Sequence, residues 1–169
     1  RDVVVTEADA LRRERLRLRR RLLVPQDEDA EAALVAAVPA VEEEHGCCSR
    51  GAVAIWAQLG SHRLQKRDFA AAAADFAHVL TMLAVVAGPE SDELIRPAEQ
   101  LCHARVMLGQ WAGARDALSR ARQLCALRYG ADHPDTRRLD HVIRGIREQM
   151  SANDAETAKA AAQVEGLAS

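Results

Sequence analysis

The sequence predicts an all-α protein, an α-solenoid of about three antiparallel helical hairpins followed by a C-terminal capping helix. Three observations support this prediction. Alanine supplies much of an apolar content of 49%, and alanine is the residue that favours the α-helix most. Glycines recur at a spacing of 42 residues, which is typical of repeated helical hairpins. Ahead of each glycine, apolar side chains follow the period of an α-helix.

The repeated glycines mark the joints between hairpins; they are Gly46, Gly88 and Gly130. Glycine adopts the left-handed conformation that ends a helix without the steric cost paid by other residues. After the glycine, Ser91 and Asp132 are expected to cap the next helix, and Pro134 suits a first helical turn. The chain is therefore predicted to end one helix and begin another at each joint.

The helix before each glycine carries one apolar row with steps of four, three and four residues, which places the row on one stripe of the helix. The three rows are Ala30, Leu34, Ala37 and Val41; Ala72, Phe76, Val79 and Leu83; and Ala114, Leu118, Ala121 and Cys125. We expect these rows in the core, together with Trp56 and Trp111, which occupy repeat positions.

One repeat carries a known pattern. The run Trp56-x-x-Leu59-Gly60, followed by Ala72, Phe76 and Val79, resembles the tetratricopeptide repeat. The 42-residue length and the joint Gly130-Ala131-Asp132-His133-Pro134-Asp135 are similar to the long repeats of kinesin light chains. The tyrosine position of the family is Arg63 here and Arg105 in the next repeat, which departs from the pattern. The resemblance covers roughly residues 47–150 and implies helical pairs that expose a concave surface to peptides or partner helices.

The predicted organisation follows from the joints. Residues 1–46 form a degenerate first hairpin, with an Arg-rich helix and then an acidic helix. Residues 47–88 and 89–130 form two repeats, and residues 131–150 form the capping helix, with Val142, Ile143 and Ile146 turned inward. The Ala-rich tail, residues 151–169, is either helical or disordered.

Charge is unevenly divided in the first hairpin, although the net charge of the chain is only −2. Residues 1–23 carry eight arginines and four acids, and residues 24–46 carry seven acids and no Lys or Arg. The two helices can pair their opposite charges. Alternatively, a basic patch docks an acidic partner or RNA phosphates; its residues are Arg12, Arg13, Arg17, Arg19, Arg20 and Arg21.

The sequence offers no motif for catalysis. It lacks the nucleophile elbow, the phosphate-binding loops and the zinc-protease motif, and acids are expected at helix starts and on charged faces. His45, Cys47 and Cys48 lack the paired spacing of a zinc site, so neither a metal nor a cofactor is predicted. The four cysteines are interpreted as reduced, which suggests an intracellular compartment, the cytoplasm or an organelle such as the mitochondrion. Residues 69–88 are nearly apolar, but Asp75 and His78 argue against a membrane span.

These observations predict a non-catalytic scaffold for protein–protein interaction, a subunit of a larger assembly. The leading helices of the repeats are expected to form a groove for the partner. Its candidate residues are Ala54, Ala57, Gln58, Ser61, Gln65, Arg96, Glu99, Gln100, His103 and Met107.

Two alternatives remain open. The first is an RNA-contacting subunit that uses the basic patch. The second is the helical region appended to a SET and MYND lysine methyltransferase. Three segments are loosely similar to that region: Ser49-Arg50-Gly51, Leu59-Gly60 and Lys66-Arg67-Asp68-Phe69.

Overall fold

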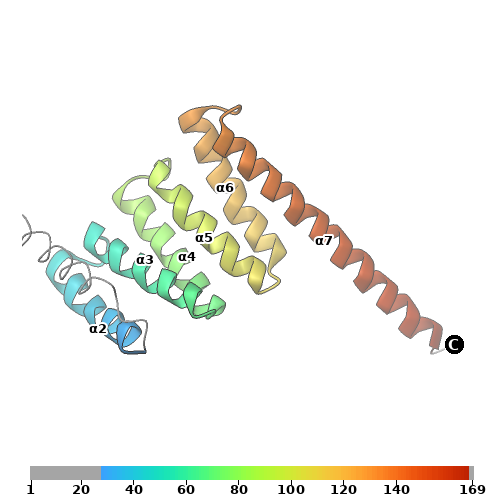
Figure 1. The fold of residues 1–169 in the computed structure, drawn as a ribbon, viewed down its shortest axis with the longest axis horizontal. Helices are drawn as coiled ribbons and strands as arrows, with labels where there is room; N and C mark the ends of the chain where they lie inside the picture. The colour runs from blue at the N-terminus through green and yellow to red at the C-terminus, as the bar shows by residue number, and fades with distance from the viewer. Residues whose placement is uncertain (1–27, 168–169) are drawn as a thin grey trace, which may run out of the picture.

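The computed structural model describes residues 28–167 of the chain, which form six α-helices and one short 3-10 helix. In chain order these are α2 (Glu28–His45), α3 (Arg50–Gln65), α4 (Phe69–Val86), η1 (Asp92–Leu94), α5 (Ile95–Met107), α6 (Trp111–Tyr129) and α7 (Pro134–Leu167). The helices lie side by side in chain order, and α7 projects beyond the others (Figure 1). The predicted Arg-rich helix and all six residues of the basic patch fall outside the described residues.

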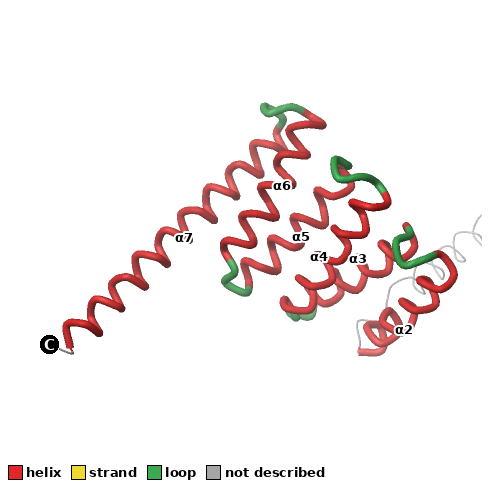
Figure 2. The backbone as a smooth tube through the Cα atoms, turned by 180° about the vertical axis from the view of Figure 1, so that it is seen from behind, coloured by secondary structure: helices red, strands yellow, loops and turns green. Residues whose placement is uncertain are grey.

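Consecutive helices pack against each other from α2 to α7, so that α3 with α4 and α5 with α6 form antiparallel hairpins. The turns that join them are short, and every described element is a helix or a loop (Figure 2). The predicted all-α fold of successive helical pairs is confirmed. We call α3, α5 and α7 the leading helices, and α4 and α6 the following helices.

The joints are made as the glycine spacing predicts. The backbone φ angles of Gly46, Gly88 and Gly130 are +87°, +95° and +97°. A residue with a Cβ is strained at these angles, which is why glycine recurs.

The start of α7 corrects one prediction about capping. Ser91 caps η1 by accepting from the Glu93 N–H at 3.2 Å, as expected. Asp132 does not cap α7; its carboxylate instead pairs with Arg137 at 3.2 Å. Because Pro134 is the first residue of α7, the residue in the capping position is His133, whose Nδ1 accepts from the Asp135 N–H at 3.3 Å.

The apolar rows of α4 and α6 are fully buried, as predicted, whereas the row of α2 is buried only at Ala30. Leu34, Ala37 and Val41 are half-buried, since α2 packs against α3 alone among the described helices. Trp56 and Trp111 are half-buried and pack against the core clusters.

The position where the helices of a hairpin cross changes along the array. In the α3–α4 hairpin, which we call the first hairpin of the described array, a Cβ on Gly60 would lie only 3.1 Å from the Phe76 ring, so a larger residue would require the ring to shift. The corresponding pair one repeat later is Cys102 and Leu118, both buried. A smaller side chain on the following helix leaves room for a larger one on the leading helix. At the next repeat position stands Arg144, which is exposed, as expected where no further helix crosses.

The first part of α7 packs on α6 through Leu139, Ile143 and Ile146. The prediction that Val142 turns inward is wrong, because its side chain is 39% exposed. A helix that packs on one neighbour only buries a single stripe, and the stripe from Leu139 through Ile143 and Ile146 excludes the adjacent Val142. The Ala-rich segment after Met150 continues α7 as helix to Leu167, and residues 151–160 are all exposed.

Candidate partner-binding face

The predicted groove residues lie on one face of α3 and α5. On α3 this face is an exposed row with helical spacing, namely Ala54, Gln58, Ser61 and Gln65, with Ala57 half-buried beside it. On α5 the exposed members are Arg96, His103 and Met107, and Glu99 and Gln100 are half-buried. Residues 42 apart have similar exposure, so the two helices present the same face. We call this surface the leading-helix face.

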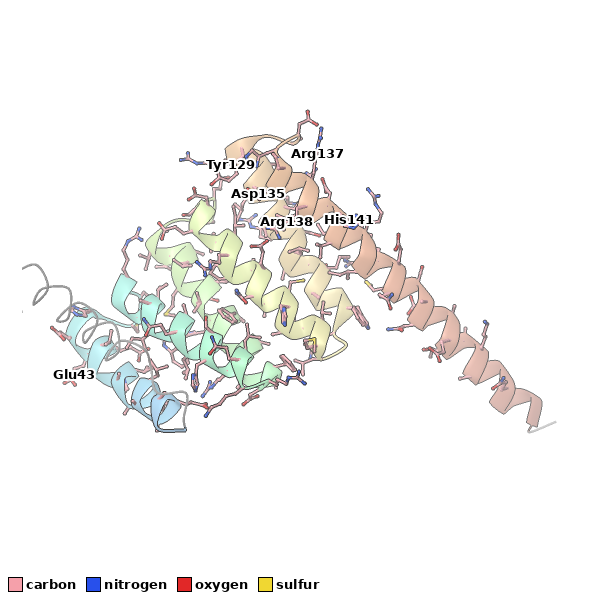
Figure 3. All side chains as sticks on the ribbon, viewed as in Figure 1. Glu43, Tyr129, Asp135, Arg137, Arg138 and His141 are labelled. Carbon is pink, nitrogen blue, oxygen red and sulfur yellow. The ribbon has the colours of Figure 1, made fainter. Side chains whose placement is uncertain are left out.

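The leading-helix face continues onto α7, which the sequence analysis missed. Shifting Arg96, Glu99 and Gln100 by 42 residues gives Arg138, His141 and Val142, all of which are exposed. Arg138 and His141 follow one another along α7 (Figure 3). The signal that would have found them is the same repeat period that located the glycines.

Two contacts join α5 to its neighbours on or near this face. Arg138 of α7 donates to the carboxylate of Glu99, so Glu99 is held in an ion pair between two leading helices. The hydrogen bond to Glu99 raises the pKa of Arg138 above its ordinary value, against the opposing effect of desolvation. The His103 ring lies 6.4 Å from the Phe69 ring, centroid to centroid.

The charge of the face changes along the array. The exposed row on α3 carries no ionisable side chain, and its Ser61 hydroxyl donates to the Ala57 carbonyl at 2.8 Å. On α5 and α7 the face carries charged side chains, namely Arg96 and the ion pair of Glu99 with Arg138. A partner that covers the whole face therefore meets uncharged side chains on α3 and charged ones on α5 and α7.

Next to this face, a buried ion pair links α3 to α4, and a second ion pair of the same arginine links α3 to α2. Arg63 of α3 donates from Nη1 to both carboxylate oxygens of Asp75 on α4 at 2.8 and 2.9 Å, and from Nε to Glu31 of α2 at 2.9 Å. Asp75 is 3% exposed in mid-helix, so the expectation that acids lie at helix starts and on charged faces is wrong for this residue. Burial raises the pKa of Asp75, although Arg63 opposes it, whereas the hydrogen bond from Arg63 lowers the pKa of Glu31. Arg63, which stands where the repeat pattern has a tyrosine, thus links α2, α3 and α4.

A second group of polar side chains gathers where α6 meets α7, at one end of the array. Tyr129, Asp135 and Arg137 lie near one another there (Figure 3). The Tyr129 ring stacks on His133 with centroids 4.9 Å apart, and Thr136 donates to the Gly130 carbonyl at 2.9 Å. These contacts end α6 and start α7, so the structure of the joint explains this group.

In the part of the chain that the structure describes, the cysteines and histidines do not gather as metal ligands would. All four cysteines are free; Cys47 and Cys48 are exposed with their sulfur atoms 4.0 Å apart. Burial raises the pKa of the Cys102 thiol to about 11, which keeps it protonated and unreactive. Over residues 28–167, no three His, Cys, Asp or Glu side chains are placed to share a cation.

Among the helices of residues 28–167, one meets the criteria of length and composition for crossing a membrane. This helix is α4, with 18 residues and a mean hydropathy of 1.8. It is also the helix that packs against both α3 and α5 and carries the ion-paired Asp75. Core helices of helical bundles have the same apolar composition.

No protein-family model and no curated protein sequence matches the chain.

Proposed function

We propose that the protein is a tetratricopeptide-like array of long repeats that serves as a non-catalytic scaffold, and that the leading-helix face binds a partner protein within a larger assembly. The observation that carries this proposal is the uncharged, exposed row on α3. In a chain with 28% charged residues, an exposed row of four side chains without a charge is suited to a protein interface, whose centre is depleted of charge.

The repetition of structure supports the assignment to long repeats. The buried positions Ala52, Leu94 and Thr136 are each separated by 42 residues, and so are Leu59, Leu101 and Ile143. Ala52 and Thr136 lie in the first turn of α3 and α7, Leu94 ends η1 directly before α5, and the second set has one member on each leading helix. Arrays of this kind expose one continuous face, which is the surface that they use for binding.

The experiment uses the full chain, affinity-tagged and returned to cells of its source, with chemical crosslinking and mass spectrometry. The test variant is Gln58→Arg/Ser61→Arg, which places two cations in the uncharged row. A partner bound by the wild type should lose affinity by about tenfold or more, which corresponds to ~1.4 kcal/mol. Crosslinks from the wild type should map to α3 and α5.

The matched control is Gln123→Arg, which adds an arginine at an exposed position on the following helix α6. This variant should retain the partner. Equal retention by the α3 variant, or crosslinks confined to the following helices, would contradict the proposal.

A further inference from the structure

The second hairpin, α5–α6, has a cavity on the side where it packs against α4. It lies between α4, α5 and α6, has a volume of about 210 Å³ and has almost wholly apolar walls. Each of the three helices contributes one alanine to the walls, namely Ala84, Ala98 and Ala117. Arg105 and Arg120 also line the cavity, through the apolar parts of their side chains, since the walls are almost wholly apolar.

The repeat period shows which side chain is missing from this place. Forty-two residues before Ala98 stands Trp56, and the same shift relates Ala84 to Glu42 and Arg120 to His78. One repeat earlier, these three side chains stand on α2, α3 and α4 and form one group. The Trp56 indole N–H donates to Glu42 at 3.1 Å, and the indole packs edge-on against the His78 ring with centroids 4.9 Å apart. The cavity is therefore the place that an aromatic ring fills one repeat earlier.

The third leading helix fills the equivalent place differently. There the residue is Asp140 of α7, which accepts two hydrogen bonds from Arg122 of α6 at 2.9 and 3.2 Å. Among the three repeat positions that the structure describes, only Ala98 has no side chain that bridges to neighbouring helices.

Within residues 28–167, the two arginines at the cavity have carbonyl groups rather than carboxylates as partners. Arg105 donates to the Gly113 carbonyl at 2.9 Å, and Arg120 donates to the Pro89 carbonyl at 2.6 Å. Neither guanidinium lies within 4.0 Å of a carboxylate in residues 28–167, whereas Arg63, the equivalent of Arg105, has two. A carboxylate presented beside a ring in this cavity could pair with Arg120, which is exposed, and with Arg105 if that guanidinium left the Gly113 carbonyl.

The walls also select among aromatic rings. Because Ala84 replaces Glu42, the cavity has no carboxylate to accept an indole N–H. Burying an unsatisfied donor is unfavourable, so a phenyl ring suits the cavity better than an indole.

We propose that this cavity binds a phenylalanine side chain flanked by carboxylates, presented by an acidic segment of a partner protein. This proposal rests on the proposed scaffold function, to which it adds a second and chemically defined contact. The ring takes the place that Trp56 holds in the first hairpin. The flanking carboxylates pair with Arg120, which is exposed, and with Arg105.

The test is a titration of the isotope-labelled full chain, followed by NMR, with the tripeptide acetyl-Glu-Phe-Glu-amide. The backbone amides of Ala98, Leu101 and Ala117 should shift. The neutral acetyl-Gln-Phe-Gln-amide and the ringless acetyl-Glu-Ala-Glu-amide should each bind about tenfold more weakly. The tryptophan analogue of the acidic peptide should also bind more weakly than the phenylalanine peptide.

Two variants report on the cavity itself. Ala98→Phe fills it from within and should abolish the shifts. Arg120→Gln leaves the fold unchanged at an exposed position and should weaken the acidic peptide without affecting the neutral one. Arg115→Gln is the control and should bind like the wild type, because Arg115 also lies on α6 and within residues 28–167 its carboxylate partner is the neighbouring Asp116.

Equal binding of the acidic and neutral peptides, the absence of shifts at the cavity, or full binding by Ala98→Phe would overturn this proposal. The tripeptide does not cover α3, and the variant that tests the leading-helix face leaves the cavity intact. Failure of one proposal is therefore distinguishable from failure of the other.

Discussion

The hairpins α3–α4 and α5–α6 follow the same backbone plan with different side chains at equivalent contacts. At the crossing, the first pairs Gly60 with Phe76, and the second pairs Cys102 with Leu118. The repeat period therefore fixes where helices meet, and the total volume at each meeting point is shared between the two helices.

The arginine that both hairpins carry at the same position shows a second difference. Arg63 has a buried carboxylate as its partner, whereas Arg105 donates to the carbonyl of Gly113. Arg105 lies directly over Gly113, and a Cβ there would be 3.2 Å from its Cδ. The residue equivalent to Gly113 is Ala71, whose Cβ denies Arg63 this arrangement. An arginine at this repeat position is therefore paired either with a carboxylate of the following helix or with a backbone carbonyl that a glycine leaves accessible.

The substitution Asp75→Ala should break this comparison with the largest effect. It leaves Arg63, which is 20% exposed, without its buried counterion, and we expect the free energy of unfolding to fall by about 3 kcal/mol. Urea unfolding followed by circular dichroism measures it. Adding Ala71→Gly should let Arg63 donate to the carbonyl of residue 71, as Arg105 donates to the carbonyl of Gly113. A double-mutant cycle should therefore show a favourable coupling of about 1 kcal/mol between the two substitutions. A single-variant loss below about 0.5 kcal/mol, or a coupling near zero, would contradict the account.

The crossing position gives the next largest effect. Gly60→Ala should destabilise the fold by about 2 kcal/mol, because its Cβ meets the Phe76 ring, although alanine favours the helix. Replacing the pair by the one found in the second hairpin, Gly60→Cys/Phe76→Leu, should cost less than Gly60→Cys alone. Thermal and urea unfolding compare them. If the double variant were less stable than Gly60→Cys alone, a smaller side chain at position 76 would not compensate for a larger one at position 60.

The ion pair with Glu31 should give the dependence on pH. The hydrogen bond from Arg63 holds the pKa of Glu31 below its ordinary value of 4.5, so this contribution is present above pH 4.5 and is lost as pH falls below it. Glu31→Gln should cost about 1 kcal/mol near neutral pH and should flatten the loss of stability on acidification. The raised pKa of Asp75 has the opposite effect, since it favours the folded state as pH falls, and the Glu31→Gln variant retains this effect. Urea unfolding at several pH values measures this, and unchanged acid sensitivity would exclude the assigned role of Glu31.

The smallest effect concerns a helical glycine without a crossing partner. Gly145 in α7 has no atom near the place of a Cβ, in contrast to Gly60. Gly145→Ala should therefore stabilise the protein by about 0.5 kcal/mol, the ordinary helix preference of alanine. Urea unfolding should show a loss of stability for Gly60→Ala and a gain for Gly145→Ala. Destabilisation by both substitutions would contradict the explanation that the crossing helix makes the difference.

The sequence was most informative where packing is periodic. The rows through Phe76 and Leu118 and the three joint glycines could be predicted because a helix buries one stripe and a left-handed turn needs glycine. The partners of Arg63 could not, since Asp75 and Glu31 are 12 and 32 residues away and only the folded arrangement joins them.

Two of the wrong predictions arose because a residue was assigned from its type alone, and one omission had a different cause. Val142 was assigned to the core from its apolar character, although the repeat period makes it the equivalent of Gln100, which lies on the leading-helix face. Asp132 was assigned as a cap from its residue type, although Pro134 fixes the start of α7 one residue later than that assignment requires. The cavity was not foreseen, because a missing side chain becomes visible only when Ala98 is compared in space with Trp56.

The long helix α7 has one further consequence. At 34 residues it is about 50 Å long, and residues 151–160 are exposed on every side. Its outer half grows from a packed first half, so it avoids the cost of nucleation and depends only on the local preference of its alanines. Amide protons should therefore exchange with solvent faster with each turn beyond Met150, and on heating this end should unwind gradually before the paired helices melt together.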